Sequence, residues 1–386
     1  MEQKNIKEIK PFKVFGPGHF IQRQMDVRGW TQTDLAEVLG LSLKTVNQLI
    51  QNKQPVTFET AQLLQEAFGI SAQAWMNHEI AYRTFVEGES EKQKAVKVKS
   101  PIYECMPIAE MCKKGWLKKT KDTSELECQV KSFWKQEKLD FAFLQNRDNL
   151  KIACKKSDAY KQYDYYALQC WAQQAMLCAE SINVPAYNKE ALQNLYENLH
   201  GYTVSRTGIE EFLRDLRKCG VKFFVLEHLQ KTYLDGAAFM DEENPVVVYT
   251  GRYKRMDNFW FTLAHEIAHV LLHINEPKCF MDNMVDPDTD QQEEEANHLA
   301  QTVLLHDIIC HYFSSTLNYL TAAKVVRGAK ELNIHPAIIL GTLAHDKQIC
   351  YAQLHQFNDN PMKYIPEQYN INFGEKLVFE TLNKRN

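Results

Sequence analysis

His265, Glu266 and His269 form the pattern in this chain most able to do chemistry, a HExxH run within the segment NFWFTLAHEIAHVLLH. On a helix, positions i and i+4 lie on the same face, so the two histidines could offer ring nitrogens to one metal ion. Glu266 stands beside the first histidine, where it could reach a water on that ion without being a ligand. Two histidines and a glutamate in this arrangement are what a zinc peptidase uses as ligands and general base.

The residues around this pattern predict a helix buried in the protein core, because they are apolar on nearly every side. They are Phe259, Trp260, Phe261, Leu263, Ala264, Ile267, Ala268, Val270, Leu271 and Leu272. Burying ionisable groups without partners is unfavourable, so a core helix that carries them needs a reason to do so. Metal ligation is such a reason, and it is favoured over a chance HExxH match on a solvated helix.

A catalytic zinc site has three protein ligands and one open position, so a third ligand must come from elsewhere. Residues 291–300, QQEEEANHLA, predict a second helix. The small residues Ala296 and Ala300 would let it pack closely on the first helix. Glu293 comes three residues before Ala296 and shares its face. We therefore predict Glu293 as the third ligand, with Glu294 as the alternative.

Three further residues are expected to support this site. Asn297, four residues after Glu293, is placed to hydrogen-bond the second nitrogen of a ligand histidine. His273, one turn after His269, is predicted to have a supporting role, because a three-histidine site needs a glycine and a longer spacing. His345 could support an oxyanion, with a solvated surface position as the equal alternative.

The residues before the HExxH helix change to a strand-like pattern. The runs VKFFVLEHL, GAAFMDEENP and PVVVYTG are β-rich and separated by turn residues, which predicts a small sheet. Residues 246–249 are the expected strand beside the helix. The edge of such a strand could pair with a peptide substrate.

The N-terminal region, from Pro17 to Phe85, predicts five short helices joined by tight turns. Thr31 is a natural N-cap with Asp34 at the capping-box position. Gly40 permits a left-handed turn, and Ser42 can cap the next helix. This order predicts a helix-turn-helix.

The second helix of that motif, residues 42–51, is the predicted DNA reader. Val46, Leu49 and Ile50 are expected to face inward. An outward face of amides, one lysine and one leucine is suited to base edges and thymine methyls. The predicted base-contacting residues are Leu43, Lys44, Thr45, Asn47 and Gln48. The predicted phosphate-contacting residues are Gln32, Ser42 and Lys53. The alternative is a helical bundle that contacts proteins.

Composition limits the possible classes of protein. The chain has 386 residues and a net charge of −4, so any contact with nucleic acid must be local. Ten cysteines without C-x-x-C pairs, and a start without a signal-peptide pattern, predict reduced thiols in the cytoplasm. No apolar run approaches the length of a membrane span.

These patterns together predict an α+β fold that is mostly α. We expect a five-helix helix-turn-helix domain over residues 1–86 and a charged linker over 87–100. A helical middle region over 101–200 would precede a zincin-like peptidase domain with a small β-sheet over 201–386.

Two parts of the chain resemble known families. NFWFTLAHEIAHVLLH followed by EEEANHLAQTVLL resembles the ImmA/IrrE family of bacterial regulatory metallopeptidases. TQTDLAEVLGLSLKTVNQLIQNKQPVTFETAQLLQEAFG resembles the HigA-type antitoxin branch of the XRE helix-turn-helix proteins. The first resemblance implies metal ligands at His265, His269 and Glu293 and a catalytic Glu266. The chain departs from that family after EEEAN, where Leu304-Leu305-His306 replaces the usual Leu-Leu-Met-Pro.

The resemblance implies a cytoplasmic, transcription-linked peptidase that cuts a repressor or another partner protein such as a toxin. Zn²⁺ is the expected cofactor, and Mn²⁺ is possible because a nitrogen and oxygen site accepts several divalent ions. The expected partners are a double-stranded DNA operator, a protein substrate and, as a homodimer reading two half-sites, a second copy of the chain. The alternative function is a HigA-like antitoxin or autorepressor of the toxin-antitoxin type, whose peptidase fold is structural and inactive. A third hypothesis is a free-standing peptidase that uses its helix-turn-helix for protein contacts.

Overall fold

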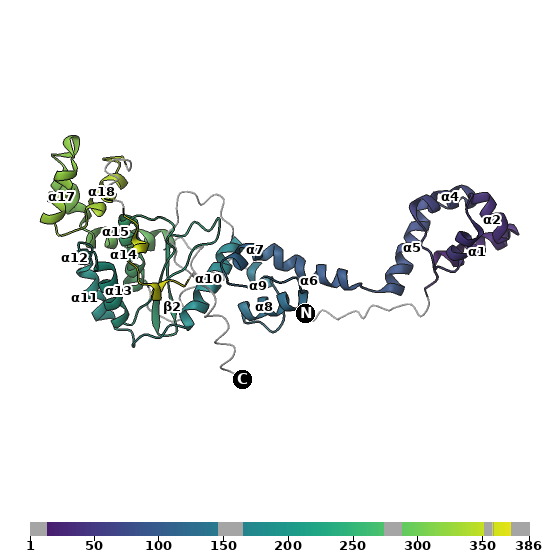
Figure 1. The fold of residues 1–386 in the computed structure, drawn as a ribbon, viewed down its shortest axis with the longest axis horizontal. Helices are drawn as coiled ribbons and strands as arrows, with labels where there is room; N and C mark the ends of the chain where they lie inside the picture. Colours follow the sequence, from purple (N-terminus) through teal and green to yellow (C-terminus); the bar gives the residue numbers. More distant parts are fainter. Residues whose placement is uncertain (1–13, 146–164, 274–287, 351–356, 358, 372–386) are drawn as a thin grey trace. The chain divides into compact units, whose positions relative to one another are not determined.

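The computed structural model describes residues 14–145, 165–273, 288–350, 357 and 359–371, and the chain divides into two compact units, Met1–Lys97 and Val98–Asn386 (Figure 1). The described residues are mostly helical with one small sheet, as predicted. Parts of the predicted middle region, 146–164, and of the C-terminal region, 372–386, lie outside the described residues. None of the helices in the described ranges has the length and apolar composition that a bilayer span requires.

The first unit contains the five predicted helices. They are α1 (Pro17–Arg28), α2 (Gln32–Leu39), α3 (Leu43–Ile50), α4 (Phe58–Phe68) and α5 (Ala72–Glu87). Each helix contributes apolar side chains to one core, among them Ile21, Leu35, Val46, Leu64 and Trp75. In α3, Val46 and Leu49 are buried as predicted, whereas Ile50 is only half-buried.

Local hydrogen bonds fix the start of α2 and the turn between α2 and α3. The Thr31 hydroxyl accepts from the backbone N–H of Asp34, and the Asp34 carboxylate accepts from the backbone N–H of Thr31, which completes the capping box. Gly40 has a φ of 65°, in the left-handed region that glycine adopts without strain. Ser42 then caps α3 by accepting from the Thr45 N–H at 3.1 Å.

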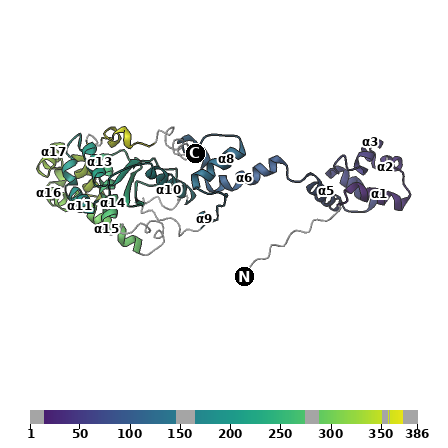
Figure 2. The same cartoon turned by 90° about the horizontal axis from the view of Figure 1, so that it is seen from below.

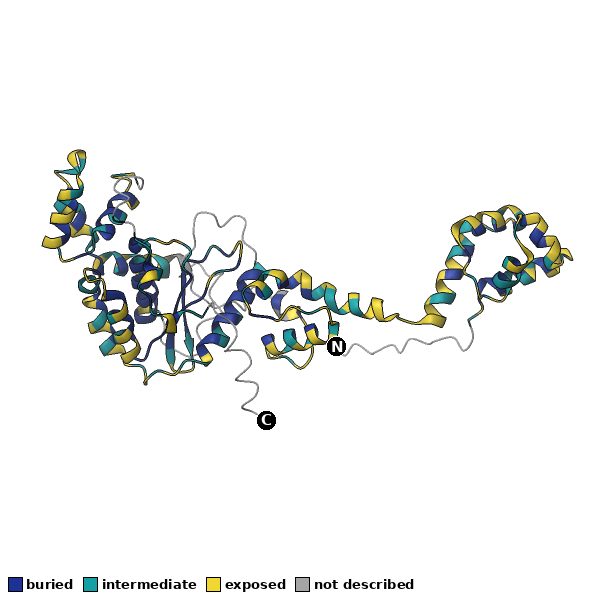
Figure 3. Cartoon of the chain, in the orientation of Figure 1, coloured by how far each residue is buried: buried dark blue, intermediate teal, exposed yellow. Residues whose placement is uncertain are grey.

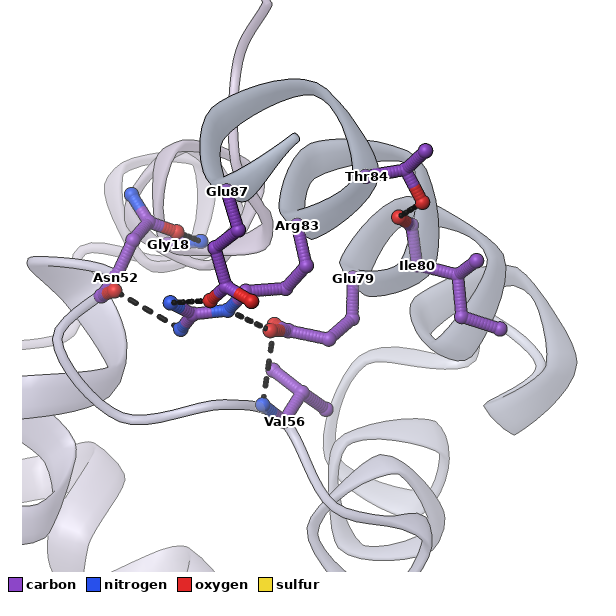
Figure 4. A network of polar contacts seen from close by, with 8 residues as sticks. All are labelled: Gly18, Asn52, Val56, Glu79, Ile80, Arg83, Thr84 and Glu87. Carbon is purple, nitrogen blue, oxygen red and sulfur yellow. Dashed lines mark hydrogen bonds and ion pairs between the residues drawn. The ribbon is translucent and has the colours of Figure 1, made fainter. Parts of the chain in front are cut away.

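A polar network holds α5 against the chain that follows α3 (Figure 4). The buried carboxylate of Glu79 accepts from the backbone N–H of Val56 at 3.1 Å and from Nε of Arg83 at 2.6 Å. Arg83 also donates to the carbonyl of Asn52 at 3.0 Å, and the Asn52 side chain accepts from the N–H of Gly18 at 2.8 Å. The network therefore ties α1 and α5 to the C-terminal side of the predicted reading helix.

The second unit begins within a helix. Its first elements are α6 (Glu91–Cys105), α7 (Ile108–Lys113), α8 (Thr123–Trp134), α9 (Ala142–Gln145), α10 (Tyr165–Glu180), α11 (Lys189–Glu197), α12 (Leu199–Tyr202) and α13 (Gly208–Lys218). Then come β1 (Lys222–Val225), β2 (Gly236–Asp241), β3 (Asn244–Tyr249), α14 (Met256–Leu272), α15 (Asp288–Val303) and α16 (His306–Phe313). The last elements are η3 (Leu317–Tyr319), α17 (Ala322–Glu331), α18 (Pro336–His345), η5 (Pro361–Lys363) and η6 (Glu367–Tyr369).

Helix α6 occupies the stretch that the sequence predicted as a linker. Its first half is mostly exposed and rich in charged residues (Figure 3). Ile102 and Cys105, near its end, are buried. The absence of aromatic residues and the density of charge gave the linker prediction. Charged residues with good helix propensity also suit an exposed helix, and that is the conformation found.

The sheet is covered by helices on both faces. Its order is β1-β3-β2, with β1 parallel and β2 antiparallel to β3. Alternate strand residues pack toward α14 on one face, namely Phe223, Val225, Ala238, Val247 and Tyr249. The others pack toward α10 on the opposite face, namely Phe224, Ala237, Phe239, Val246 and Val248. Both views show α10 and α13 on opposite sides of the sheet (Figure 2). The middle region therefore supplies the cover of one face of this sheet.

The strand predicted at residues 246–249 is present, but the substrate-pairing edge predicted for it is wrong. The strand is β3, the centre of the sheet, and both of its edges are already paired. The chain reaches β3 through a tight hairpin from β2, so β2 pairs with one edge, and β1 pairs with the other. Among the described residues, no strand pairs with the second edge of β2.

Candidate metal centre

Helix α14 is a core helix that holds the HExxH residues in the interior. Its buried side chains surround the helix axis, and they include His265, Glu266 and His269. A buried tyrosine of α11, Tyr196, donates from its hydroxyl to the carbonyl of Ala264 at 3.1 Å. Packing and this hydrogen bond therefore fix the backbone from which the histidines project.

Helix α15 brings a carboxylate to the two histidines. Ala296 and Ala300 are fully buried, and α15 packs along α14 through them. The absence of larger side chains at these positions allows the close approach. Glu293, one turn earlier on α15, then lies beside His265 and His269.

The ligand atoms of these three residues converge on one point. Nε2 of His265 lies 3.0 Å from Nε2 of His269, and the Glu293 oxygens lie 3.3 and 3.4 Å from these two nitrogens. Zinc bonds of about 2.0–2.2 Å at tetrahedral angles would separate nitrogen and oxygen ligands by roughly 3.3–3.6 Å. Two imidazole nitrogens and one carboxylate oxygen therefore fit a divalent metal ion in both chemistry and spacing.

The charge state of Glu293 suits this role. Burial alone would raise the pKa of its carboxyl group, but the polar and charge interactions with the ring nitrogens of His265 and His269 together outweigh burial and lower that pKa to about 2. Glu293 is therefore ionised at neutral pH, as a carboxylate ligand must be.

Three other predicted site residues, Glu294, Asn297 and His345, lie on α15 and α18. Glu294, the alternative ligand, is exposed. Asn297 is half-buried one turn after Glu293, and the hydrogen bond predicted for it stays a prediction. His345 is an exposed residue at the end of α18, and its Nδ1 lies 3.2 Å from Asp346, in a different cluster. That contact offers no support for a role of His345 beside Glu266.

Outside the three ligand atoms of the candidate centre lie His273 and Glu295, a glutamate for which no role was predicted. Nδ1 of His273 lies 3.1 Å from Nδ1 of His269, and its Nε2 lies 3.1 Å from the carboxylate of Glu295. Burial lowers the pKa of His273, while its hydrogen bond with Glu295 acts in the opposite direction. The sequence indicated a role for Glu295 only indirectly, through its partner His273, which lies one turn beyond His269.

A glycine that the sequence analysis did not single out lies against the predicted catalytic glutamate. A Cβ placed on Gly236, the first residue of β2, would lie 2.8 Å from Oε1 of Glu266 and 2.6 Å from Cγ2 of Thr262. Only a residue without a side chain allows β2 and α14 to approach so closely here. The Glu266 carboxylate therefore lies next to the strand whose outer edge carries no further strand among the described residues.

The predicted DNA-contacting residues lie on the first unit. Ser42, Leu43, Lys44 and Lys53 are exposed. Gln32, Thr45, Asn47 and Gln48 are half-buried. The amide of Asn47 donates to Oε1 of Gln32 at 3.2 Å, so this pair links α3 to the start of α2. The structure therefore gathers most of these residues on α3 and the turns that flank it.

Two family models match the chain. The IrrE N-terminal-like domain, a peptidase model of family M78, matches residues 218–333 and thus includes the three candidate ligands and Glu266. A helix-turn-helix model matches residues 21–75 and includes α2 and α3. A comparison with curated proteins gives no match. One solved structure, of a hypothetical protein from E. coli, matches at 21% identity over 25% of this chain and 96% of its own, with a TM-score of 0.21, which supports no conclusion about the fold.

Proposed function

Because the chain combines an XRE-type helix-turn-helix domain with an IrrE-like peptidase domain, we propose that it is a transcription-linked regulator with zinc-dependent endopeptidase activity. It would act on a regulatory protein, such as a repressor or a toxin, in the cytoplasm. The observation that carries this proposal is the convergence of His265, His269 and Glu293 beside the buried Glu266.

Each residue of the centre has a distinct task in this proposal. His265, His269 and Glu293 would hold the metal ion. A zinc ion bound there would supply Lewis-acid chemistry that polarises a scissile carbonyl and acidifies an attacking water. The Glu266 carboxylate takes the proton of that water and passes it to the leaving amine. His273 and Glu295 keep the His269 ring in the orientation that directs Nε2 inward.

We infer a peptide as the substrate class from the outer edge of β2, which pairs with no strand among the described residues, although residues 236–239 of that strand are buried. An extended peptide can add to such an edge through backbone hydrogen bonds, with side-chain pockets giving specificity. The close approach of Gly236 to the side chain of Glu266, the proposed general base, supports this inference. We therefore assign to β2 the substrate-pairing role that the sequence analysis assigned to residues 246–249.

The first unit would carry the DNA-binding part of the function. The exposed Lys44 and Leu43 on α3 are suited to base edges, and Lys53 is suited to a phosphate. A regulator of this kind would recognise an operator with α3 in the major groove. Pairing of two copies on two half-sites stays a prediction.

The test compares the full-length wild type with Glu266→Gln. We expect one zinc per chain at the proposed centre in both proteins. Elemental analysis measures this zinc as the difference in metal content between each protein and the same protein carrying Glu293→Gln. New protein N-termini, detected by mass spectrometry, should appear in cells that express the wild type and not the variant. Selection of bound duplexes from random-sequence DNA should return the same site for both proteins.

The results also separate this proposal from the rival function. A wild type that holds metal at this centre but produces the same N-termini as Glu266→Gln would contradict the peptidase proposal. With DNA binding retained, that result would favour an antitoxin or autorepressor with a structural peptidase fold. A wild type from which Glu293→Gln removes no metal would contradict the proposed ligand set.

A further inference from the structure

We propose that His306, Cys310 and Asp346 form a second metal site, distinct from the centre on α14 and α15, and that this site takes zinc. Their donor atoms all lie within 4.8 Å of one another. The first two residues are on α16, and Asp346 caps the C-terminal end of α18. A cation bound there would bridge two helices of the peptidase domain.

The spacing on α16 matches what one ion requires. His306 and Cys310 are four residues apart, so they lie on one face of the helix. Nε2 of His306 lies 3.1 Å and Sγ of Cys310 lies 3.4 Å from the same oxygen, Oδ2 of Asp346. Tetrahedral zinc, with bonds of about 2.0–2.3 Å, would separate these pairs of atoms by roughly 3.3–3.6 Å.

Outer contacts already orient the donors. Nδ1 of His306 lies 2.9 Å from the Asp307 carboxylate, which leaves Nε2 as the inward nitrogen. A metal-bound histidine commonly has such a carboxylate on its other nitrogen. Nδ1 of His345 lies 3.2 Å from Oδ1 of Asp346, on the oxygen that does not contact Cys310. Both contacts favour the arrangement in which Nε2 and Oδ2 serve as ligands.

The two helices that carry the cluster are rigidly held. Ile309 and Phe313 of α16 and Ile339 and Leu343 of α18 are buried in the core of the peptidase domain, where the two helices pack together. The donors therefore project from fixed backbones. The cluster itself is only partly buried, so a cation could reach it from solvent.

The donor set selects the class of metal. One imidazole nitrogen, one thiolate sulfur and one carboxylate oxygen suit zinc, whereas magnesium and calcium prefer oxygen ligands alone. The sulfur ligand also distinguishes this site from the first centre, whose donors are nitrogen and oxygen. This difference gives the experiment a signal that requires a sulfur ligand.

The test is a cobalt titration of the full-length, reduced protein after its metal has been removed. Co²⁺ replaces zinc and gives a thiolate-to-cobalt charge-transfer band in the near ultraviolet only when sulfur is a ligand. We expect this band in the wild type and its loss in Cys310→Ser. Cys128→Ser, which changes an exposed cysteine elsewhere, should keep the band.

A second variant controls for the possibility that Cys310→Ser loses the band through misfolding. His306→Gln keeps the thiol, and it should weaken zinc binding at this site at least about tenfold in competition with a chromogenic chelator. Glu293→Gln should leave the band unchanged, so the result does not depend on the first centre or on the proposed peptidase activity. A folded wild type without the band, or a band that survives in Cys310→Ser, would overturn the proposal.

Discussion

The Nδ1 atoms of His269 and His273 lie 3.1 Å apart, one helical turn from each other on the HExxH helix and just beyond it. One of the two nitrogens must donate its proton to the other for this contact to be a hydrogen bond. If His273 donates from Nε2 to Glu295, its Nδ1 accepts from His269. The Nε2 of His269 then carries a lone pair and faces His265 and Glu293, as a metal ligand must.

The first prediction concerns this outer contact. Replacing His273 with alanine should weaken zinc binding at the candidate centre about 10–100-fold, because the His269 ring loses its orienting partner. Competition with a chelator of known affinity measures the change. His298→Ala, which removes an exposed histidine from α15, should leave the affinity unchanged. Equal affinities in the two variants would show that His273 does not position the ligand.

The second prediction separates adjacent glutamates on α15. Glu293→Gln should lower zinc affinity by more than about 100-fold, because it removes a direct ligand rather than an outer partner. Glu294→Gln should bind zinc like the wild type, since Glu294 is exposed. Elemental analysis after dialysis against a chelator distinguishes them. Loss of the metal in Glu294→Gln and its retention in Glu293→Gln would reverse the assignment.

Relations between residues of one helix could be predicted from their spacing in the sequence, and so could the helix caps. The i, i+4 relation of His265 and His269 and the capping box of Thr31 and Asp34 depend only on helix geometry. The approach of Glu293 to the histidines also followed from the small residues on its face, although it crosses between two helices.

Relations set by tertiary packing could not be predicted in the same way. The strand at residues 246–249 was identified, but its central place depends on where β1 and β2 pair with it. Gly236 gave no signal because its importance comes from the approach of another element. Glu295 is about half exposed, so hydrophobic periodicity places it in water, although its carboxylate reaches His273.

The third prediction concerns the close approach of Gly236, on β2, to the Glu266 side chain on α14. In Gly236→Ala, the new methyl group would have to displace the Glu266 carboxylate or the Thr262 side chain. We expect cleavage of the identified substrate to fall more than about tenfold and stability to fall by about 1–3 kcal/mol, with the metal retained. Gly201→Ala is the matched control, because its Cβ would have only Asn333 Nδ2 nearby, at 3.8 Å. Wild-type cleavage by Gly236→Ala would show that the position of Glu266 tolerates the change.

The fourth prediction concerns DNA. Lys53→Ala should weaken binding to all duplexes and reduce the slope of log affinity against log salt concentration by about 1, as expected for one lost phosphate contact. Asn47→Ala should instead relax specificity at one base pair by about 1–3 kcal/mol. Fluorescence anisotropy at several salt concentrations measures both effects. An unchanged salt slope in Lys53→Ala would place that lysine away from the phosphates.

The last prediction concerns the buried carboxylate of the first unit. Glu79→Ala leaves the N–H of Val56 without its acceptor and Arg83 without its closest ion-pair partner. Such losses cost about 2–4 kcal/mol in a buried network. Glu87→Ala, which removes the exposed partner of Arg83, should cost less than about 1 kcal/mol.

Hydrogen exchange measured on the full chain detects this loss of stability in peptides of the first unit. Peptides from α3 to α5 should lose protection in Glu79→Ala and keep it in Glu87→Ala. DNA affinity should fall as well, because Arg83 contacts the carbonyl of Asn52, which comes soon after the predicted reading helix α3. If protection were retained in Glu79→Ala, apolar packing around Trp75 and Leu64 would be sufficient to hold α5 in place.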